Sequence, residues 1–498
     1  MLMFMKNWET VRADLRSLTP HGLPWALLAV AAFVFLVPNV DFAGQLAWHD
    51  GQRLAQLVLL AVVLFTLAAP DAARRAARVW ASLPRWMRIA LLTAFALGFA
   101  SSLAAPLSRW ALLDWGMLLL LLTLALSVAA NRQAFGDRLD QPMVLLFFAT
   151  ATAYAVSVCT VYGAMLLAGP AYGQGFNVRE LYTGFSNIRF FGHVQTMLLP
   201  FLLLPGLWWG TTRARRVMLW GIPAIWWMLV VGSGTRGTWV ALLVGIVAVA
   251  MYGGRIGRQW IKWQFAGLLC GLLCYAVFIL AVPQLLEQPV SFLHRAEDIV
   301  SLSQREVLWA TSIGFAAQHP LLGVGPMHYA YFATEVAAHP HNAVLQWLAE
   351  WGVPVALLFT ATTAAAGLAF ARRVRLSVDD RGTRQGLVSV ALLAALSGAA
   401  AQAMVDGIIV MPVSQTLLAL LMGWAMGTHF PQGARAARCT TSEYVLAAAL
   451  VVMAAVAVLF GAATEIGHIA EREKAYLAAH PTAVRLLPRF WAQGWIND

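Results

Sequence analysis

The amino-acid sequence predicts an all-α polytopic membrane protein with about 12 or 13 transmembrane helices. Three observations support this fold class. Of the 498 residues, 60% are hydrophobic and only 11% are charged, a composition that a soluble core cannot accommodate. Windows of about 20 mostly apolar residues, the length needed to cross the hydrocarbon of a bilayer, recur along nearly the whole chain. Arginines gather in every second connection between these windows.

Thirteen apolar windows account for most of the chain. They are rich in Leu, Ala and Val, which favours membrane helices over the short alternating strands of an outer-membrane barrel. The windows cover residues 22–40, 53–70, 88–105, 109–130, 143–169, 193–210, 217–232, 237–253, 263–283, 343–371, 386–405, 408–427 and 444–463. The expected divisions are N-terminal transmembrane helices (1–283, about nine), a large outer loop (284–342), C-terminal transmembrane helices (343–463) and a C-terminal tail (464–498).

The positions of the arginines predict the orientation of these helices, because cationic loops are retained in the cytoplasm. Two windows separate each arginine-bearing connection from the next, so the alternation places the N-terminus inside and the connections 170–192 and 284–342 outside. Thirteen spans would put the tail outside, whereas twelve would put it in the cytoplasm. The net charge of +11 then belongs mostly to cytoplasmic loops and lipid headgroups, and it requires no nucleic-acid partner.

Several kinds of chemical site are missing from the sequence. There is no Walker lysine motif, no dinucleotide fingerprint and no His-Glu-x-x-His sequence. The cysteines lie within windows or in a cytoplasmic connection, with no nearby His or carboxylate to complete a metal site. Carboxylates in the outer loops show no metal-ligand spacing. We therefore expect neither a metal nor a cofactor.

Four outer segments carry the unusual residues. Arginine is disfavoured in exported connections, so each one there needs a reason, although long loops are translocated regardless of charge. The segments are Ser-Asn-Ile-Arg-Phe-Phe-Gly-His at 186–193, Gly-Ser-Gly-Thr-Arg-Gly-Thr at 232–238, Gln-Arg-Glu-Val-Leu-Trp at 304–309 with His-Pro-Leu-Leu-Gly-Val-Gly-Pro at 319–326, and His-Pro-His-Asn at 339–342.

These segments resemble the O-antigen ligase and polymerase superfamily of bacterial membrane glycosyltransferases, and more particularly the ligases. The most specific element is His341-Asn342 followed by nine residues and Gly352, although Val355 stands where a second glycine is usual. A second family-like element is Arg-x-x-x-Trp beginning at Arg305, followed by His-Pro-Leu-x-Gly-x-Gly. The resemblance runs from about residue 189 to residue 352.

The resemblance implies a GT-C-like membrane fold in the bacterial inner membrane, with the active site and the large loop facing the periplasm. The implied reaction transfers a glycan from undecaprenyl diphosphate to a hydroxyl group without a nucleotide sugar. For a ligase, the acceptor is the lipid A-core oligosaccharide, so the expected partners are the lipid-linked glycan, lipid A-core and membrane lipids. O-antigen polymerase and protein O-oligosaccharyltransferase are enzymatic alternatives, and a lipid-linked oligosaccharide flippase is a non-enzymatic one.

The chemistry of this leaving group suits arginine. A lipid diphosphate develops negative charge as it departs, and a guanidinium holds that charge with a planar fork that matches phosphate oxygens. Arg189, Arg236 and Arg305 are all predicted to lie outside, and we assign them to the donor diphosphate as a group. Such a cluster would take the place of the divalent metal that many glycosyltransferases use.

An alcohol acceptor needs a base, and a histidine with an ordinary pKa near 6.5 suits that task. We expect His341, at the mouth of a span, to be the catalytic base, and the resemblance points to the same residue. Three supporting candidates are His339 as an alternative base, Arg295 at substrate phosphates, and Glu350, which would orient His341 or pair with an arginine. His193 is expected at the surface or an interface. A single displacement predicts inversion at the anomeric carbon.

Overall fold

The computed structural model describes residues 24–42, 44, 46–168, 175–291, 304–332, 336–429, 440–481 and 486–496. Almost all of this described chain is helical, and each of the thirteen apolar windows contains an α-helix. Nine helical stretches in it are long and apolar enough to cross a membrane. The predicted class, an all-α polytopic membrane protein, is therefore confirmed.

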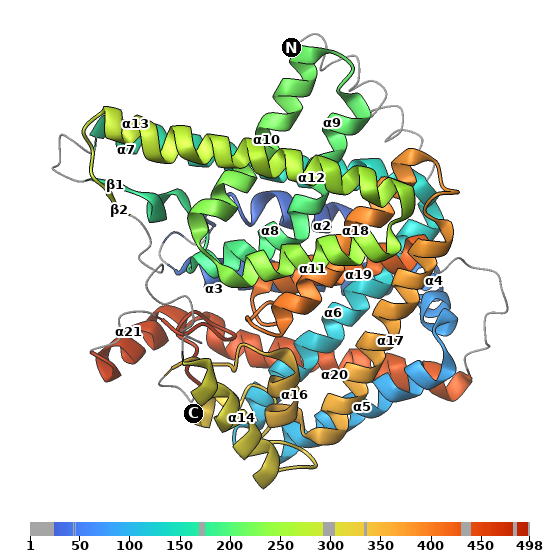
Figure 1. Ribbon diagram of the computed structural model, residues 1–498. Helices are drawn as coiled ribbons and strands as arrows, with labels where there is room; N and C mark the ends of the chain where they lie inside the picture. The colour runs from blue at the N-terminus through green and yellow to red at the C-terminus, as the bar shows by residue number, and fades with distance from the viewer. Residues whose placement is uncertain are drawn as a thin grey trace.

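The elements follow one another in simple order (Figure 1). The first half contains α2 (Trp25–Leu36), α3 (Trp48–Leu67), α4 (Pro70–Ser82), α5 (Arg85–Ala104), α6 (Ser108–Phe135), η1 (Gly136–Leu139), α7 (Asp140–Ala168), β1 (Phe176–Asn177), η3 (Val178–Leu181), α8 (Ile188–Leu202), α9 (Leu204–Trp209), α10 (Arg213–Ser233) and α11 (Arg236–Tyr252). The second half contains α12 (Gly254–Cys274), η4 (Tyr275–Ala281), α13 (Val282–Leu285), β2 (Val290–Ser291), α14 (Arg305–Gln318), α15 (Tyr329–Phe332), α16 (Ala343–Trp351), α17 (Val353–Ser377), α18 (Thr383–Ala403), α19 (Pro412–His429), α20 (Thr441–Ile466) and α21 (Ile469–Ala479).

Most of the thirteen predicted windows correspond to the nine membrane-length stretches, but the window 408–427, which contains α19 (18 residues), is not among the nine. The stretch Ser108–Ala168 is 61 residues long and holds both α6 and α7, which the short helix η1 separates. Two apolar helices, α2 with 12 residues and α11 with 17, are shorter than the membrane-length criterion. The window 343–371 is divided at Gly352, whose φ of 82° ends α16 and lets α17 begin in a new direction.

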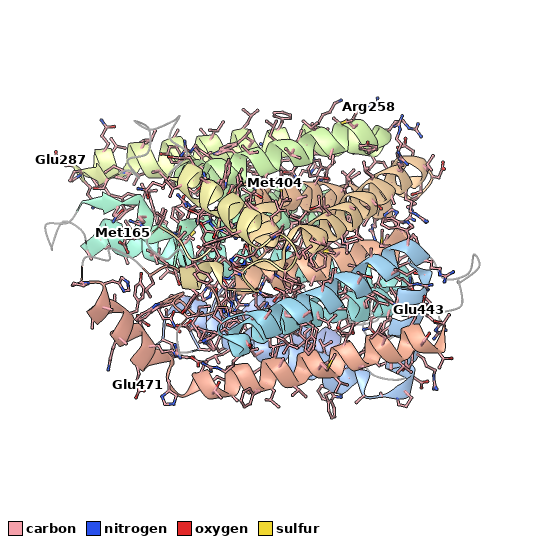
Figure 2. The ribbon with its side chains drawn as sticks, turned by 90° about the horizontal axis from the view of Figure 1, so that it is seen from below. Met165, Arg258, Glu287, Met404, Glu443 and Glu471 are labelled. Carbon is pink, nitrogen blue, oxygen red and sulfur yellow. The ribbon has the colours of Figure 1, made fainter. Side chains whose placement is uncertain are left out.

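The two ends of the helix bundle carry different parts of the chain. Figure 2 shows Arg258 and Glu443 at one end, and Met165, Glu287 and Glu471 at the opposite end. The arginine pattern predicts the first pair to be cytoplasmic and Met165 and Glu287 to lie outside. Because Glu471 of α21 shares their end, the tail lies where an odd number of crossings would put it, which favours thirteen spans over twelve.

The helix α8 forms the centre of the bundle. It packs against α7, α10, α11, α18 and α19. Of the apolar window in Ile188–Trp209, 94% is buried, compared with 17% for Gly254–Leu285, so α8 is enclosed by protein while α12 faces lipid. Stacked rings hold the first turns of α8, because the ring centroid of Phe191 lies 4.4 Å from that of Tyr154 and the Phe191 ring also contacts Trp226. The N-terminus of α8 is thereby held at the outer end of the bundle.

The two long outer connections meet in a small parallel sheet. In it Phe176 pairs with Val290 and Asn177 pairs with Ser291. The Phe176 N–H also donates to the Pro289 carbonyl at 2.8 Å. This pairing joins the segment before α8 to the segment that follows α13, so the two loops with most of the unusual residues lie on one side of the molecule.

Cysteine labelling tests this arrangement of ends. In a background where the four native cysteines are replaced by serine, Glu287→Cys and Glu471→Cys should react with an impermeant maleimide added to intact cells. Arg258→Cys should react only after the membrane is opened, because it lies at the other end of the bundle. Labelling of Glu471→Cys together with Arg258→Cys, and not with Glu287→Cys, would contradict an odd number of crossings.

Candidate functional site

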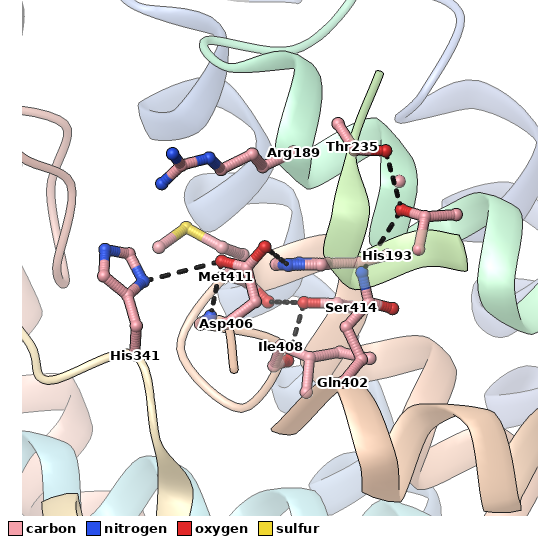
Figure 3. Close-up of polar contacts among 12 residues, drawn as sticks. Arg189, His193, Thr235, His341, Gln402, Asp406, Ile408, Met411 and Ser414 are labelled. Carbon is pink, nitrogen blue, oxygen red and sulfur yellow. Dashed lines mark hydrogen bonds and ion pairs between the residues drawn. The ribbon is translucent and has the colours of Figure 1, made fainter. Parts of the chain in front are cut away.

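A carboxylate that the sequence analysis did not select lies between two histidines. Asp406 Oδ2 is 3.4 Å from His193 Nε2, and Asp406 Oδ1 is 3.5 Å from His341 Nδ1 (Figure 3). The side chains of His193 and Asp406 are 0% and 5% exposed, whereas that of His341 is 15% exposed. Figure 3 also shows the second ring nitrogen of His341 turned away from Asp406. Of these three residues, His341 is the most exposed.

The loop between α18 and α19 fixes Asp406 in place. The Gly407 N–H donates to Asp406 Oδ1 at 2.8 Å, and Ser414 donates its hydroxyl to the Ile408 carbonyl at 2.7 Å. A side chain at Gly407 would collide with the imidazole of His339, so glycine is needed for the loop to approach the His339–His341 segment. The loop that carries Asp406 and the His339–His341 segment are therefore packed against each other.

The backbone of His341 is strained in a way that serves this contact. Its φ of 55° lies in the left-handed region, which non-glycine residues seldom adopt and which often marks a functional site. Its N–H donates to His339 Nδ1 at 3.3 Å, and Trp309 Nε1 donates to the Pro340 carbonyl at 3.2 Å. Asn342 then caps α16 by accepting from the Leu345 N–H at 3.0 Å.

The protonation states follow from these surroundings. Burial lowers the pKa of the His341 imidazole; Asp406 raises it, and the charges of Arg189 and Arg305 lower it again, leaving it below its ordinary value. Burial alone would raise the pKa of the Asp406 carboxyl, but His193 and His341 outweigh burial and hold that pKa well below its usual range. At neutral pH the pair is thus a carboxylate beside a neutral imidazole that can accept a proton.

His339 is less suited to act as a base. Its side chain is buried, and burial lowers its pKa well below the ordinary value, with further lowering from His341 and Arg489. Its ring lies 4.2 Å from the ring of His341 in an edge-on arrangement and packs where Gly407 leaves room. His339 therefore packs between the His341 ring and Gly407.

The three predicted arginines lie together at helix N-termini. Arg236 and Arg305 are the first residues of α11 and α14, and Arg189 is the second residue of α8. Burial lowers the pKa of the Arg305 guanidinium, Asp406 raises it, and repulsion from Arg189 and Arg236 lowers it again, so the charges of Arg189 and Arg236 both act on Arg305. Helix N-termini carry partial positive charge. The cluster thus forms a strongly cationic surface beside His341, and Figure 3 shows Arg189 above the His341–Asp406 pair.

A network of hydroxyl groups holds the short turn that carries Arg236. Ser233 Oγ and Thr238 Oγ1 each lie 2.9 Å from Thr235 Oγ1. A side chain at Gly192 would collide with the Thr238 hydroxyl, so the first turns of α8 and α11 are in direct contact. This contact brings the arginines of the two helices to the same place, independently of the electrostatic effects.

Part of the chain matches a known family model. Residues 222–360 match the family model described as O-antigen ligase. This match supports the O-antigen ligase and polymerase superfamily for that segment of the chain. The match confirms the resemblance found from the motifs and supports a general role in glycosyl transfer for this multi-pass membrane protein. No curated protein matches the sequence significantly.

The remaining sequence candidates have different outcomes. Glu350 does not contact His341: its Oε2 lies 2.7 Å from Arg489 Nη2, so pairing with an arginine is the alternative that holds. Arg295 lies outside the described residues. The expectation that His193 is at the surface or an interface is wrong, because the ring is fully buried one turn inside α8. In the part of the chain that the structure describes, no group of three or more His, Cys, Asp or Glu is arranged to hold a metal ion.

Asp406 and Arg489 are the functional candidates that sequence reasoning missed. Asp406 had a usable signal: it is the one charged residue in the turn between the windows 386–405 and 408–427, and the same reasoning selected Arg236. Arg489 had none, because it lies in a tail of mixed charge without apolar periodicity.

Binding of inorganic pyrophosphate tests the cluster formed by Arg189, Arg236 and Arg305. Saturating pyrophosphate should raise the unfolding temperature, because a ligand at 100 times its Kd stabilises the folded state by about 2.7 kcal/mol. Arg305→Gln should lose most of this shift, and Arg258→Gln, an exposed cation at the other end of the bundle, should retain it. Equal shifts in both variants would show that the anion binds elsewhere.

Proposed function

We propose that this protein is an O-antigen ligase that transfers a glycan from undecaprenyl diphosphate to a sugar hydroxyl of lipid A-core at the periplasmic face of the inner membrane. The observation that carries the proposal is the pairing of His341 with the buried carboxylate Asp406 beside three arginines at helix N-termini. The His341–Asp406 pair activates an alcohol, and the three arginines bind a diphosphate.

The proposed reaction is a single displacement. The acceptor hydroxyl oxygen attacks the anomeric carbon while the bond from that carbon to the diphosphate oxygen breaks. The hydroxyl proton passes to His341 Nε2, and Asp406 stabilises the imidazolium that forms. The departing undecaprenyl diphosphate keeps the bonding electron pair, and configuration at the anomeric carbon is inverted. Retention of configuration in the product would contradict this mechanism.

The arginine cluster supplies electrostatic stabilisation in this mechanism. Negative charge on the diphosphate grows as the glycosidic bond breaks, and the guanidiniums of Arg189, Arg236 and Arg305 stabilise that charge. Two of these side chains, Arg189 and Arg305, are half-buried, which strengthens their interaction with charge relative to water. No nucleotide is consumed, since the energy resides in the donor's phosphate linkage.

The decisive experiment reconstitutes purified protein with undecaprenyl diphosphate-linked glycan and lipid A-core, in the presence of a chelator and without nucleotide. Wild-type protein should move glycan onto lipid A-core. His341→Ala should abolish transfer, and Asp406→Asn should slow it by about 100-fold or more, because general-base assistance is worth that much. His468→Ala, an exposed histidine at the end of α20, should behave as wild type. Elongation of the lipid-linked glycan in place of transfer would identify a polymerase, and neither reaction with donor still bound would indicate a flippase.

The pH dependence of transfer tests the role of the pair. Because the pKa of His341 lies below its ordinary value, the neutral base is present at pH 7, and kcat/KM should fall only as the pH drops through that lowered pKa. In Asp406→Asn the carboxylate that raises this pKa is gone, so the acid limb should move to still lower pH as the maximal rate falls. If the acid limb of the kcat/KM profile lies at the same pH in Asp406→Asn as in wild type, His341 is not the titrating group.

A further inference from the structure

The end of the chain returns to the candidate site. Residues 486–496 follow α21 and run back toward α16 (Figure 1, red). Arg489, Phe490 and Trp491 are buried, with Arg489 and Trp491 each 1% exposed. A buried arginine in an irregular tail is costly unless its charge is paired, so the contacts of this segment carry information.

The side chain of Arg489 joins the tail to the helix that follows His341. Its Nη2 lies 2.7 Å from Glu350 Oε2 and 3.2 Å from Asp114 Oδ2. With its amide turned to satisfy hydrogen bonding, the Gln346 oxygen accepts from Arg489 Nη1 at 2.6 Å. Glu350 and Gln346 both lie on α16, whose first turn begins two residues after His341. The tail thus holds α16 by two side chains on one face.

The backbone of the tail is joined to the loop that carries Asp406. Arg53, buried in α3, donates from Nε to the Phe490 carbonyl at 3.1 Å and from Nη2 to the Arg489 carbonyl at 3.3 Å. The same Nη2 donates to the Val410 carbonyl at 2.7 Å, four residues after Asp406. One guanidinium therefore links the tail to the loop between α18 and α19.

A third contact reaches the segment before His341. Gly494 has a φ of 67°, and a side chain there would collide with the Leu487 carbonyl and lie 3.1 Å from the Cβ of Ala338. Ala338 directly precedes His339, whose ring packs under His341. The tail consequently contacts the segment 336–342, the helix α16 and, through Arg53, the loop 404–411.

We propose that residues 486–496 are a clamp that sets the geometry of the His341–Asp406 pair, with Arg489 as its positioning residue. The two members of the pair come from separate loops, and their contact of 3.5 Å depends on how those loops sit against each other. The clamp packs against the first loop at Ala338 and is joined to the second through Arg53. It acts in addition to the direct hydrogen bond between the two loops, in which Asn342 Nδ2 donates to the Met404 carbonyl at 3.0 Å. This inference rests on the proposed function for its catalytic consequence, while its structural consequence is independent of it.

The test compares full-length variants by hydrogen exchange. Arg489→Gln removes the charge, Arg489→Lys keeps it, and Gly494→Ala disturbs the tail without changing any charge. Arg132→Gln is the matched control, because Arg132 forms a buried bidentate pair with Asp140 at 2.7 and 2.8 Å, away from the pair. Amides of residues 336–342 and 404–411 should exchange about tenfold faster or more in Arg489→Gln and Gly494→Ala, less so in Arg489→Lys, and as in wild type in Arg132→Gln.

The kinetic arm measures transfer in the same variants. Arg489→Gln should lower kcat about 100-fold and leave KM for the donor nearly unchanged, since misalignment of a base affects the chemical step. Unchanged exchange in both loops of Arg489→Gln, or equal acceleration in Arg132→Gln, would overturn the clamp. If Arg489→Gln does not fold, Gly494→Ala decides by the same criterion. If wild-type protein transfers no glycan, the proposed function fails, and the exchange data still decide the clamp.

Discussion

The buried charge of Asp406 is the constraint on which the outer end of the bundle depends. Removing a carboxylate from water costs several kcal/mol unless nearby groups compensate, and at a bundle end enclosed by apolar helices few such groups exist. The compensation comes from the Gly407 N–H, the two histidines and the positive field of the arginines. Each of these comes from a different segment, so satisfying one carboxylate brings the segments together.

The positions of the arginines on their helices add to the positive electrostatic potential at the site. Arg189, Arg236 and Arg305 stand at the beginnings of three helices, where unpaired N–H groups already favour an anion. Three guanidiniums next to one another repel: burial lowers the pKa of Arg305 most, and the charges of Arg189 and Arg236 lower it further. The positive charges of such a site repel one another until an anion binds among them. Burial lowers the pKa of His341 most, and the charges of Arg189 and Arg305 lower it further, so the arginines proposed to bind the diphosphate also favour the neutral imidazole.

The sequence analysis selected those site residues whose unfavourable placement, or whose motif, can be recognised from neighbouring residues alone. An arginine in an exported turn is expensive, so Arg236 stood out, and His341 belonged to a spaced motif. His193 was misjudged because it is the first residue of an apolar window, whereas α8 begins five residues earlier, at Ile188, and encloses it. Arg489 pairs with Glu350 across 139 positions, and no periodicity or composition in the tail encodes a contact of that range. The helices were predictable because each spans the membrane by its own composition; their tertiary partners were not.

The extent of the family match bears on how the site is built. Residues 222–360 contain His341, Arg236 and Arg305, but Arg189 and Asp406 lie outside that range. The matched segment alone would leave His341 without the carboxylate that orients it, and Glu350 buried without its cation, since Arg489 also lies outside. Uncompensated buried charge strongly destabilises a fold. The contacts that pair His341 and Glu350 therefore come from outside the segment that carries the family signature, namely from the loop between α18 and α19 and from residues 486–496.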